Sequence, residues 1–196
     1  MPLMPDFELG LWNAWILVLS FFLVNVGLTL IERKFKHKGT RPDRPTYNEK
    51  EEKLTIVLMG TVIASFIYSI FLPLKLGTAW FYAGLSIYLL GMIFLTVAEL
   101  DYVSNPEDEL LTKGVYYISR NPMWFGLFLV LFGIGVACAS LIYLLCALVF
   151  IILQHILIGA EERWCLGKYE NAYREYMDRT PKWIGIPKSE KRNSEA

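Results

Sequence analysis

Charged residues are scarce in this sequence, and neither sign exceeds the other. They make up 19% of 196 residues, as 19 Lys and Arg against 19 Asp and Glu. Without a basic excess, the chain lacks the electrostatic footprint of a nucleic-acid-binding protein. Cysteine is also rare: the three residues are Cys138, Cys146 and Cys165. An odd count with these spacings fits neither a disulfide framework nor a metal site, so we expect reduced, structural thiols and no bound metal.

The first residues, "MPLMPDFELG", lack the basic segment with which a signal peptide begins. No small-residue cleavage pattern follows the first apolar run either. We therefore expect that run to remain in the protein as a transmembrane helix.

Apolar residues are abundant, at 55% of the chain, which is typical of a membrane protein. We predict a single all-α membrane domain over 1–196, built as a bundle of five transmembrane helices. A span needs about 20 residues to cross ~30 Å of hydrocarbon. The predicted spans cover residues 9–31, 54–74, 78–98, 122–137 and 140–159.

The last two spans come from one apolar run of 38 residues, 122–159. As one straight helix it would be about 57 Å long, too long for a single crossing. The small residues "ACAS" at 137–140 are a suitable place for a reversal. The run therefore predicts a helical hairpin with almost no loop.

The positions of Lys and Arg predict how the spans are oriented. Five spans put the loops 32–53 and 99–121 on one side with the segment after 159, and these hold eight, two and eight Lys or Arg. The other side holds only Lys75. Because basic residues favour the cytoplasmic side, we predict an outside N-terminus and a cytoplasmic C-terminus.

The segment after the fifth span has an apolar stripe with helical spacing. Leu166, Tyr169, Tyr173 and Tyr176 follow at i, i+3, i+7 and i+10, with most charged residues elsewhere. This pattern predicts a cytosolic amphipathic helix at about 161–178, lying on the membrane surface or against the bundle.

A first candidate site lies in "GVYYISRNPMWFG", which joins the third span to the fourth. Asn121 is a favourable N-cap and Pro122 a favourable first helical residue, so the stretch can simply be a helix start with Arg120 as a boundary charge. Alternatively, the helix N-terminus and the guanidinium of Arg120 form a site for an anionic group, with neighbouring aromatic side chains as walls.

A second candidate site is "GAEERW", directly after the fifth span. Glu161 and Glu162 can mark the membrane exit, or one of them can pair with a ligand ammonium group. Glu162 shares a helical face with His155, and both are candidate catalytic residues. Together the two sites complement a zwitterionic amino-acid group, such as the one that S-adenosylmethionine carries.

Two stretches of the sequence resemble a known superfamily. "ELLTKGVYYISRNPMWFG" is similar to the segment L…G-P-Y-x-x-x-R-[HN]-P-M-Y-x-G of the isoprenylcysteine carboxyl methyltransferase and phospholipid methyltransferase superfamily. "EERW…KYENAYREYMDRTPKWI" resembles its C-terminal motif, and the resemblance covers residues 108–188. Asn121 stands where carboxyl methyltransferases usually have His, and Asn is common in the phospholipid branch.

The resemblance implies an integral membrane methyltransferase that uses S-adenosylmethionine and a lipophilic acceptor from the bilayer. Carried over by position, it implies a cofactor site of Gly114, Tyr116, Arg120, Asn121, Pro122, Glu161 and Glu162. It implies a lid or acceptor region of Tyr173, Tyr176 and Arg179.

Two other functions compete with methyl transfer. Sterol reductases have a similar C-terminal segment and use a nicotinamide cofactor, but they are usually longer and have more spans. A non-enzymatic membrane protein that kept the fold would leave Arg120, Glu161 and Glu162 as boundary charges. The sequence leaves open whether the acceptor is a carboxylate, an amine, a thiol or a quinone-like lipid.

Overall fold

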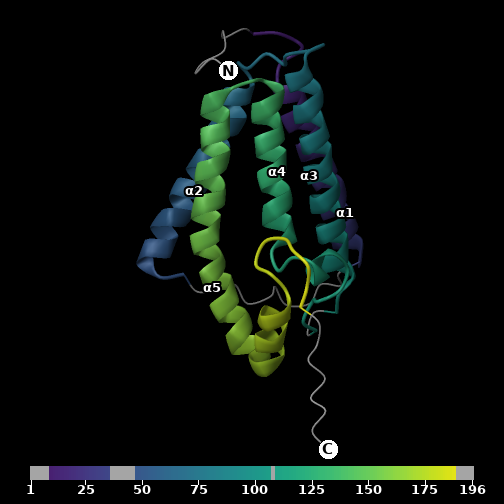
Figure 1. Ribbon diagram of the computed structural model, residues 1–196, viewed down its shortest axis with the longest axis vertical. Coiled ribbons are helices and arrows are strands. Elements are labelled where there is room, and N and C mark those ends of the chain that lie inside the picture. Colours follow the sequence, from purple (N-terminus) through teal and green to yellow (C-terminus); the bar gives the residue numbers. More distant parts are fainter. Residues whose placement is uncertain (1–8, 36–46, 107–108, 189–196) are drawn as a thin grey trace, which may run out of the picture.

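The computed structural model describes residues 9–35, 47–106 and 109–188, and this part of the chain is all-α, as predicted. Its elements are α1 (Trp15–Phe35), α2 (Glu49–Ser69), α3 (Ala79–Ser104), the 3₁₀ helix η1 (Gly114–Tyr117), α4 (Pro122–Ala137) and α5 (Leu141–Arg179). The helices lie side by side along the long axis, and α5 lies between α2 and α4 (Figure 1).

Four of these helices are long and apolar enough to cross a membrane: α1, α2, α3 and α5. The chain is therefore a multi-pass membrane protein. The predicted fourth span forms α4, which has only 16 residues. A helix of that length is about 24 Å long, less than the ~30 Å of a hydrocarbon core. Large apolar side chains such as Ile56, Ile93 and Ile152 are exposed on α2, α3 and α5, as expected of helices that have lipid as their solvent.

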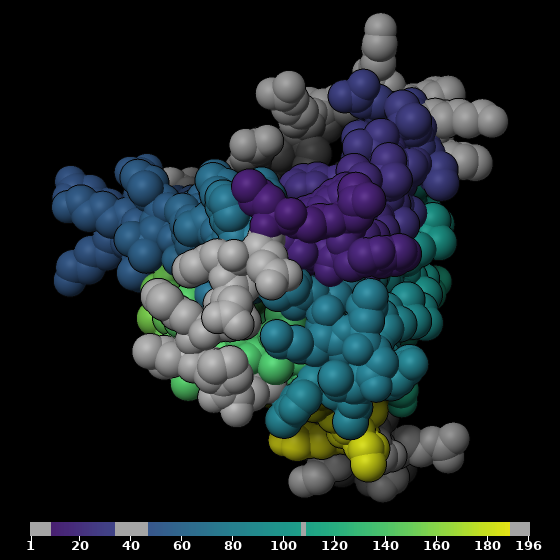
Figure 2. Space-filling model, turned by 90° about the horizontal axis from the view of Figure 1, so that it is seen from above, coloured from purple at the N-terminus to yellow at the C-terminus, as the bar shows by residue number. Residues whose placement is uncertain are grey.

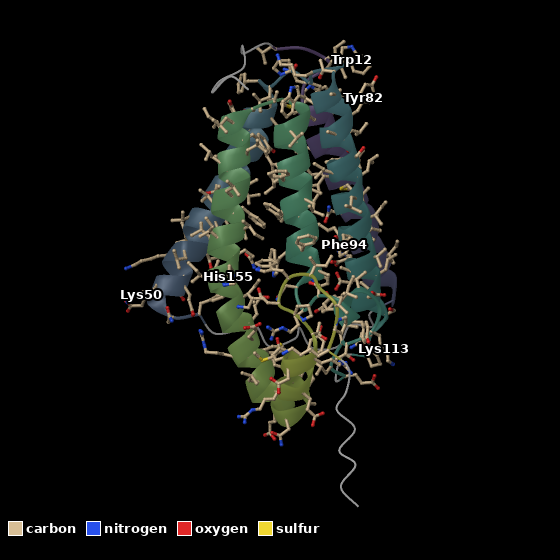
Figure 3. The ribbon with its side chains drawn as sticks, in the orientation of Figure 1. Trp12, Lys50, Tyr82, Phe94, Lys113 and His155 are labelled. Carbon is tan, nitrogen blue, oxygen red and sulfur yellow. The ribbon has the colours of Figure 1, made fainter. Side chains whose placement is uncertain are left out.

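The two ends of the bundle carry different residues. Exposed Trp12, Trp80 and Tyr82 lie at or near one end, whereas Lys50 and Lys113 lie toward the other. Figure 3 shows Trp12 and Tyr82 at the top and Lys50 and Lys113 in the lower part. Aromatic residues of this kind favour the membrane–water interface, and this end is called the aromatic end below.

At the aromatic end, the chain before α1 pairs with the α2–α3 connection. The Ala14 N–H donates to the Leu72 carbonyl at 2.8 Å, and the Leu74 N–H donates to the Trp12 carbonyl at 3.0 Å. Figure 2 shows these parts of the chain packed together at this end. The pairing explains why α1 begins at 15 rather than 9 and why α2 ends at 69 rather than 74, which corrects the two predicted boundaries.

Helices α3 and α4 touch along glycines spaced seven residues apart. Gly84 and Gly91 on α3 face Gly133 and Gly126 on α4. A Cβ atom at Gly91 would lie 2.7 Å from the Val130 backbone nitrogen, closer than any real Cβ contact. Small residues of this kind let membrane helices approach closely. The seam fixes the short α4 firmly against α3, with the start of α4 at the lower end of the bundle.

The reversal between α4 and α5 lies at the predicted "ACAS". Helix α4 ends at Ala137, and Ala139 adopts a left-handed conformation with φ of 51°. Ser140 is the N-cap of α5, and its hydroxyl accepts a hydrogen bond from the Tyr143 N–H at 3.3 Å. The predicted hairpin is therefore confirmed.

The predicted fifth span, 140–159, and the predicted cytosolic helix, 161–178, lie in one element, α5. Helix α5 runs without interruption past 159, and its break lies at Glu170, where φ is 45° and ψ is −117°. After this break the chain turns back toward the bundle (Figure 1). The break also separates Leu166 and Tyr169 from Tyr173 and Tyr176, which the sequence placed on one continuous face.

Candidate active site

A buried ion pair joins the start of α4 to α5. Arg120 Nη1 lies 3.1 Å from Glu162 Oε1, and the two side chains are only 9% and 12% exposed. Lys182 Nζ lies 3.4 Å from the other oxygen of the same carboxylate, Glu162 Oε2. The sequence assigned Arg120 to a ligand carboxylate and Glu162 to a ligand ammonium group. The structure brings both residues together and makes each the other's partner.

This ion pair leaves hydrogen-bonding capacity unused. Nε and Nη1 of Arg120 and Oε1 of Glu162 are buried and have no hydrogen-bond partner among the described residues. The short contact between them is therefore ionic, without hydrogen-bond geometry. Buried polar atoms are usually paired, because leaving them unpaired costs about 1–3 kcal/mol. The pair can thus take a ligand that brings an anionic group to Arg120 and a cationic group to Glu162.

The first residues of α4 are arranged differently from the predicted cap. Pro122 is the first helical residue, as predicted. Asn121 precedes it, but its side chain makes no capping hydrogen bond, so its predicted role as an N-cap side chain is wrong. Instead, Asn121 Nδ2 donates to the Lys182 carbonyl at 3.0 Å. The side chain that could have capped α4 therefore holds the returning C-terminal chain.

That returning chain, residues 180–188, is named here the C-terminal strap. The Arg120 N–H donates to the Pro181 carbonyl at 3.0 Å, and the Gly185 N–H donates to the Ile118 carbonyl at 3.1 Å. Figure 3 shows nitrogen and oxygen atoms gathered where the lower part of α5 meets this strap. Sequence reasoning missed the strap, although "TPKWIGIPK" carries the Lys and Trp side chains that fasten it.

The strap also reaches His155, the predicted catalytic candidate on α5. Trp183 Nε1 donates to His155 Nδ1 at 3.0 Å, and the two rings stack at an interplanar angle of 26°. Nδ1 of the imidazole is the acceptor of this bond. In this arrangement His155 fastens the strap.

The loop before α4 depends on Gly114. Its φ is +60°, and a Cβ atom there would collide with the Asp101 carboxylate. The next residue uses this approach, because the Val115 N–H donates to Asp101 Oδ2 at 2.9 Å. Gly114 thus lets the loop close onto the end of α3. Burial, followed by the charge of Glu99, raises the pKa of Tyr116 in η1, so this phenol stays neutral.

Three residues predicted near the acceptor lie against the same loop. Tyr176 Oη donates to the Tyr116 carbonyl at 2.6 Å, and the Tyr173 and Tyr176 rings lie 5.9 Å apart. The Arg179 guanidinium lies 5.7 Å from the centre of the Tyr117 ring. These residues fold the end of α5 onto η1.

Glu161 faces a different environment from Glu162, as expected of adjacent helical residues about 100° apart. Trp124 Nε1, from the first turn of α4, donates to Glu161 Oε2 at 3.2 Å. Burial, and then the charges of Glu161 and Glu51, raise the pKa of Tyr47 just before α2. Tyr47 therefore lies near Glu161.

A second ion pair fixes α2 to α5. Arg163 Nη2 lies 2.6 Å from Glu51 Oε1, and Glu51 also closes a capping box with Asn48 at the start of α2. Within the described ranges, no group of three His, Cys, Asp or Glu is placed to hold a metal ion.

Comparison with known proteins agrees with the predicted superfamily. The phospholipid methyltransferase family model matches residues 73–172, just over half of the chain. No curated protein matches it. The matched range includes α3, η1, α4 and α5 up to its break, with Arg120, Trp124, Glu161 and Glu162, whereas the C-terminal strap lies outside it. The chain belongs to the phospholipid methyltransferase family, within the superfamily that also contains the isoprenylcysteine carboxyl methyltransferases.

Proposed function

We propose that this protein transfers a methyl group from S-adenosylmethionine to the amine of a phospholipid headgroup that reaches the site from the bilayer. Family membership supports methyl transfer. The observation that carries the proposal is the buried Arg120–Glu162 pair, whose unused donors and acceptor complement a zwitterionic amino-acid group.

Arg120 would hold the cofactor carboxylate and Glu162 its ammonium group. The loop residues Gly114 and Tyr116, with Asn121 and Pro122 at the start of α4, would form the adjoining wall. S-adenosylmethionine supplies a methyl group that is already activated on a sulfonium. The protein therefore needs to align the acceptor and exclude water. The C-terminal strap, which lies over the start of α4, would contribute to both tasks.

The acceptor would approach between helices whose outer faces are apolar. Tyr173, Tyr176 and Arg179 would contribute indirectly, by holding η1 and its loop in place. Asn121 is common in the phospholipid branch, which favours an amine over a carboxylate as the acceptor. Its hydrogen bond to the strap gives Asn121 a second role. We place this end of the bundle in the cytoplasm, where the cofactor is made.

Calorimetry with S-adenosylhomocysteine tests the cofactor site in detergent-purified protein. We expect micromolar binding by the wild type and its loss in Arg120→Ala and Glu162→Ala. The matched control is Lys113→Ala, because Lys113 is exposed at the same end. Absence of binding by a folded wild type would contradict the proposal, and binding of a nicotinamide dinucleotide instead would favour a reductase.

A further inference from the structure

The C-terminal strap is a closed loop. The Lys188 N–H donates to the Arg179 carbonyl at 3.0 Å, so the two ends of the strap meet. Compact surface loops whose ends lie close together are frequently functional. Figure 1 shows the strap rising from the end of α5 back along the bundle, to about the height at which α4 begins. The middle of the strap therefore lies nearer to the membrane-spanning part of the molecule than its two ends do.

The middle of the strap carries no charged side chain. Residues 183–187 are Trp-Ile-Gly-Ile-Pro, and a lysine stands directly before and directly after them, at Lys182 and Lys188. Ile184 is 47% exposed and Ile186 is 94% exposed. Trp favours the membrane–water interface, and lysines are attracted to anionic headgroups at the same surface. This composition is typical of a segment that enters the surface of a bilayer.

The strap is fastened to the lipid-facing stripe of α5. His155 is exposed and follows the exposed Ile152 by three residues, so both lie on one face of the helix. Trp183 stacks on His155 and donates its Nε1–H to Nδ1 at 3.0 Å. Figure 3 shows His155 level with the strap. The indole ring therefore continues the stripe at its lower end. The apolar members of the stripe are exposed and have helical spacing: Leu145, Leu148, Val149, Ile152 and Ile156.

Neighbouring residues of the strap point in two directions. Lys182 Nζ lies 3.4 Å from Glu162 Oε2, in the buried charge cluster between α4 and α5. The next residue, Trp183, lies against His155 on the exposed face of α5. With Lys182 held inside, the strap presents Trp183 and the exposed isoleucines that follow it to the outside.

We propose that Trp183, Ile184 and Ile186, named here the strap tip, form a membrane-contact surface whose partner is the lipid leaflet around this end of α5. Lipid is favoured over a second protein because the strap tip continues an apolar stripe that runs along α5 from 145 to 156. The flanking lysines suit headgroups on either side of the tip. In water, the tip would instead leave apolar surface exposed, which is unfavourable. This contact would exist whatever reaction the protein catalyses.

The test places a fluorophore on the strap tip of the full-length protein in lipid nanodiscs. Ile186→Cys is labelled with bimane, because this side chain is almost fully exposed and its replacement disturbs no packing. Lipids that carry a nitroxide beside the headgroup should quench this label severalfold more strongly than aqueous iodide does. The matched control is Asn171→Cys, because Asn171 is exposed and directly follows the break in α5. There iodide should be the stronger quencher. The unmodified chain, with its three cysteines, gives the background labelling.

A second measurement needs no label, because it uses the indole of Trp183. Trp183→Phe keeps a ring that can stack on His155 and removes only the indole emission of this position. The difference in emission between the wild type and this variant therefore belongs to Trp183. Lipids brominated near the headgroup should quench that difference.

Three results would overturn the proposal. Stronger quenching of the Ile186→Cys label by iodide than by lipid nitroxide, as at Asn171→Cys, would place the strap tip in water. Protection of that label from both quenchers would show that protein covers the tip, either another part of this chain or a second copy. A Trp183 emission that brominated lipids leave unchanged would separate the indole from the lipid.

Discussion

Tyr176 on the last turns of α5 donates its hydroxyl hydrogen to the backbone carbonyl of Tyr116 in η1, at 2.6 Å. The two residues are 60 positions apart in the sequence, and this bond holds the end of α5 on the loop that precedes α4. The loop in turn carries Arg120. The position of that guanidinium therefore depends on a hydroxyl group at the far end of the chain.

The first prediction concerns this hydroxyl. Tyr176→Phe should destabilise the protein by about 1 kcal/mol, the usual contribution of one hydrogen bond, and weaken S-adenosylhomocysteine binding severalfold. Thermal unfolding in detergent and calorimetry measure the two effects. Tyr82→Phe, at the exposed aromatic end, is the control and should change neither. Equal behaviour of the two variants would show that the bond does not position the loop.

The second prediction concerns the fastening of the C-terminal strap. Trp183→Ala removes both the hydrogen bond to His155 and the stacked ring. If the strap covers bound cofactor, this variant should speed the dissociation of S-adenosylhomocysteine severalfold, measured by stopped-flow competition. Ile186→Ala is a matched control on the same strap, because Ile186 is 94% exposed. An unchanged dissociation rate for Trp183→Ala would contradict a covering role.

The third prediction concerns the seam between α3 and α4. In Gly91→Ala the new methyl group would meet the Val130 backbone at 2.7 Å, so the helices must separate. We expect a loss of about 1–3 kcal/mol, as for other overpacked sites. Gly60→Ala on α2 meets nothing within 4 Å and should leave stability unchanged or raise it. Thermal unfolding measures both variants. Equal stability of Gly91→Ala and Gly60→Ala would refute the close approach of α3 and α4.

The fourth prediction concerns orientation. The distribution of Lys and Arg predicts that the aromatic end faces outside and the Lys113 end faces the cytoplasm. In intact cells, a membrane-impermeant maleimide should label Leu76→Cys and should leave Lys113→Cys unlabelled until the cells are permeabilised. The unmodified chain, with its three natural cysteines, sets the background. The reverse pattern would invert the topology.

Local patterns predicted much of this molecule from the sequence. Long apolar runs require helices in a bilayer, the small residues at 137–140 mark the reversal, and Pro122 marks the start of α4. The ordered motif pair predicted the family. Arg120 and Glu162 were singled out for their charge and their place at helix ends, and the structure brings them together.

What the sequence could not predict depends on contacts between distant segments. Glu170 adopts a positive φ without the Gly or Asn that usually signals one, so the break in α5 has no local mark. The side chain of Asn121 satisfies the rule for an N-cap, but the strap offers it a different acceptor. The start of α1 shifts because its first residues pair with the α2–α3 connection. Each of these outcomes is decided by a segment 50 or more residues away or by tertiary packing.

Helix α4 is about 6 Å shorter than the hydrocarbon core. With its upper end level with the upper boundary of the hydrocarbon core, its lower end would stop about 6 Å short of the lower boundary, just beneath the headgroup layer. On the proposed function, a lipid could then present its amine without leaving its leaflet, and the energetic cost of extracting acyl chains into water would not arise. The enzyme would sample its substrate in two dimensions, so turnover would follow the mole fraction of acceptor lipid in the surface and not its amount per volume.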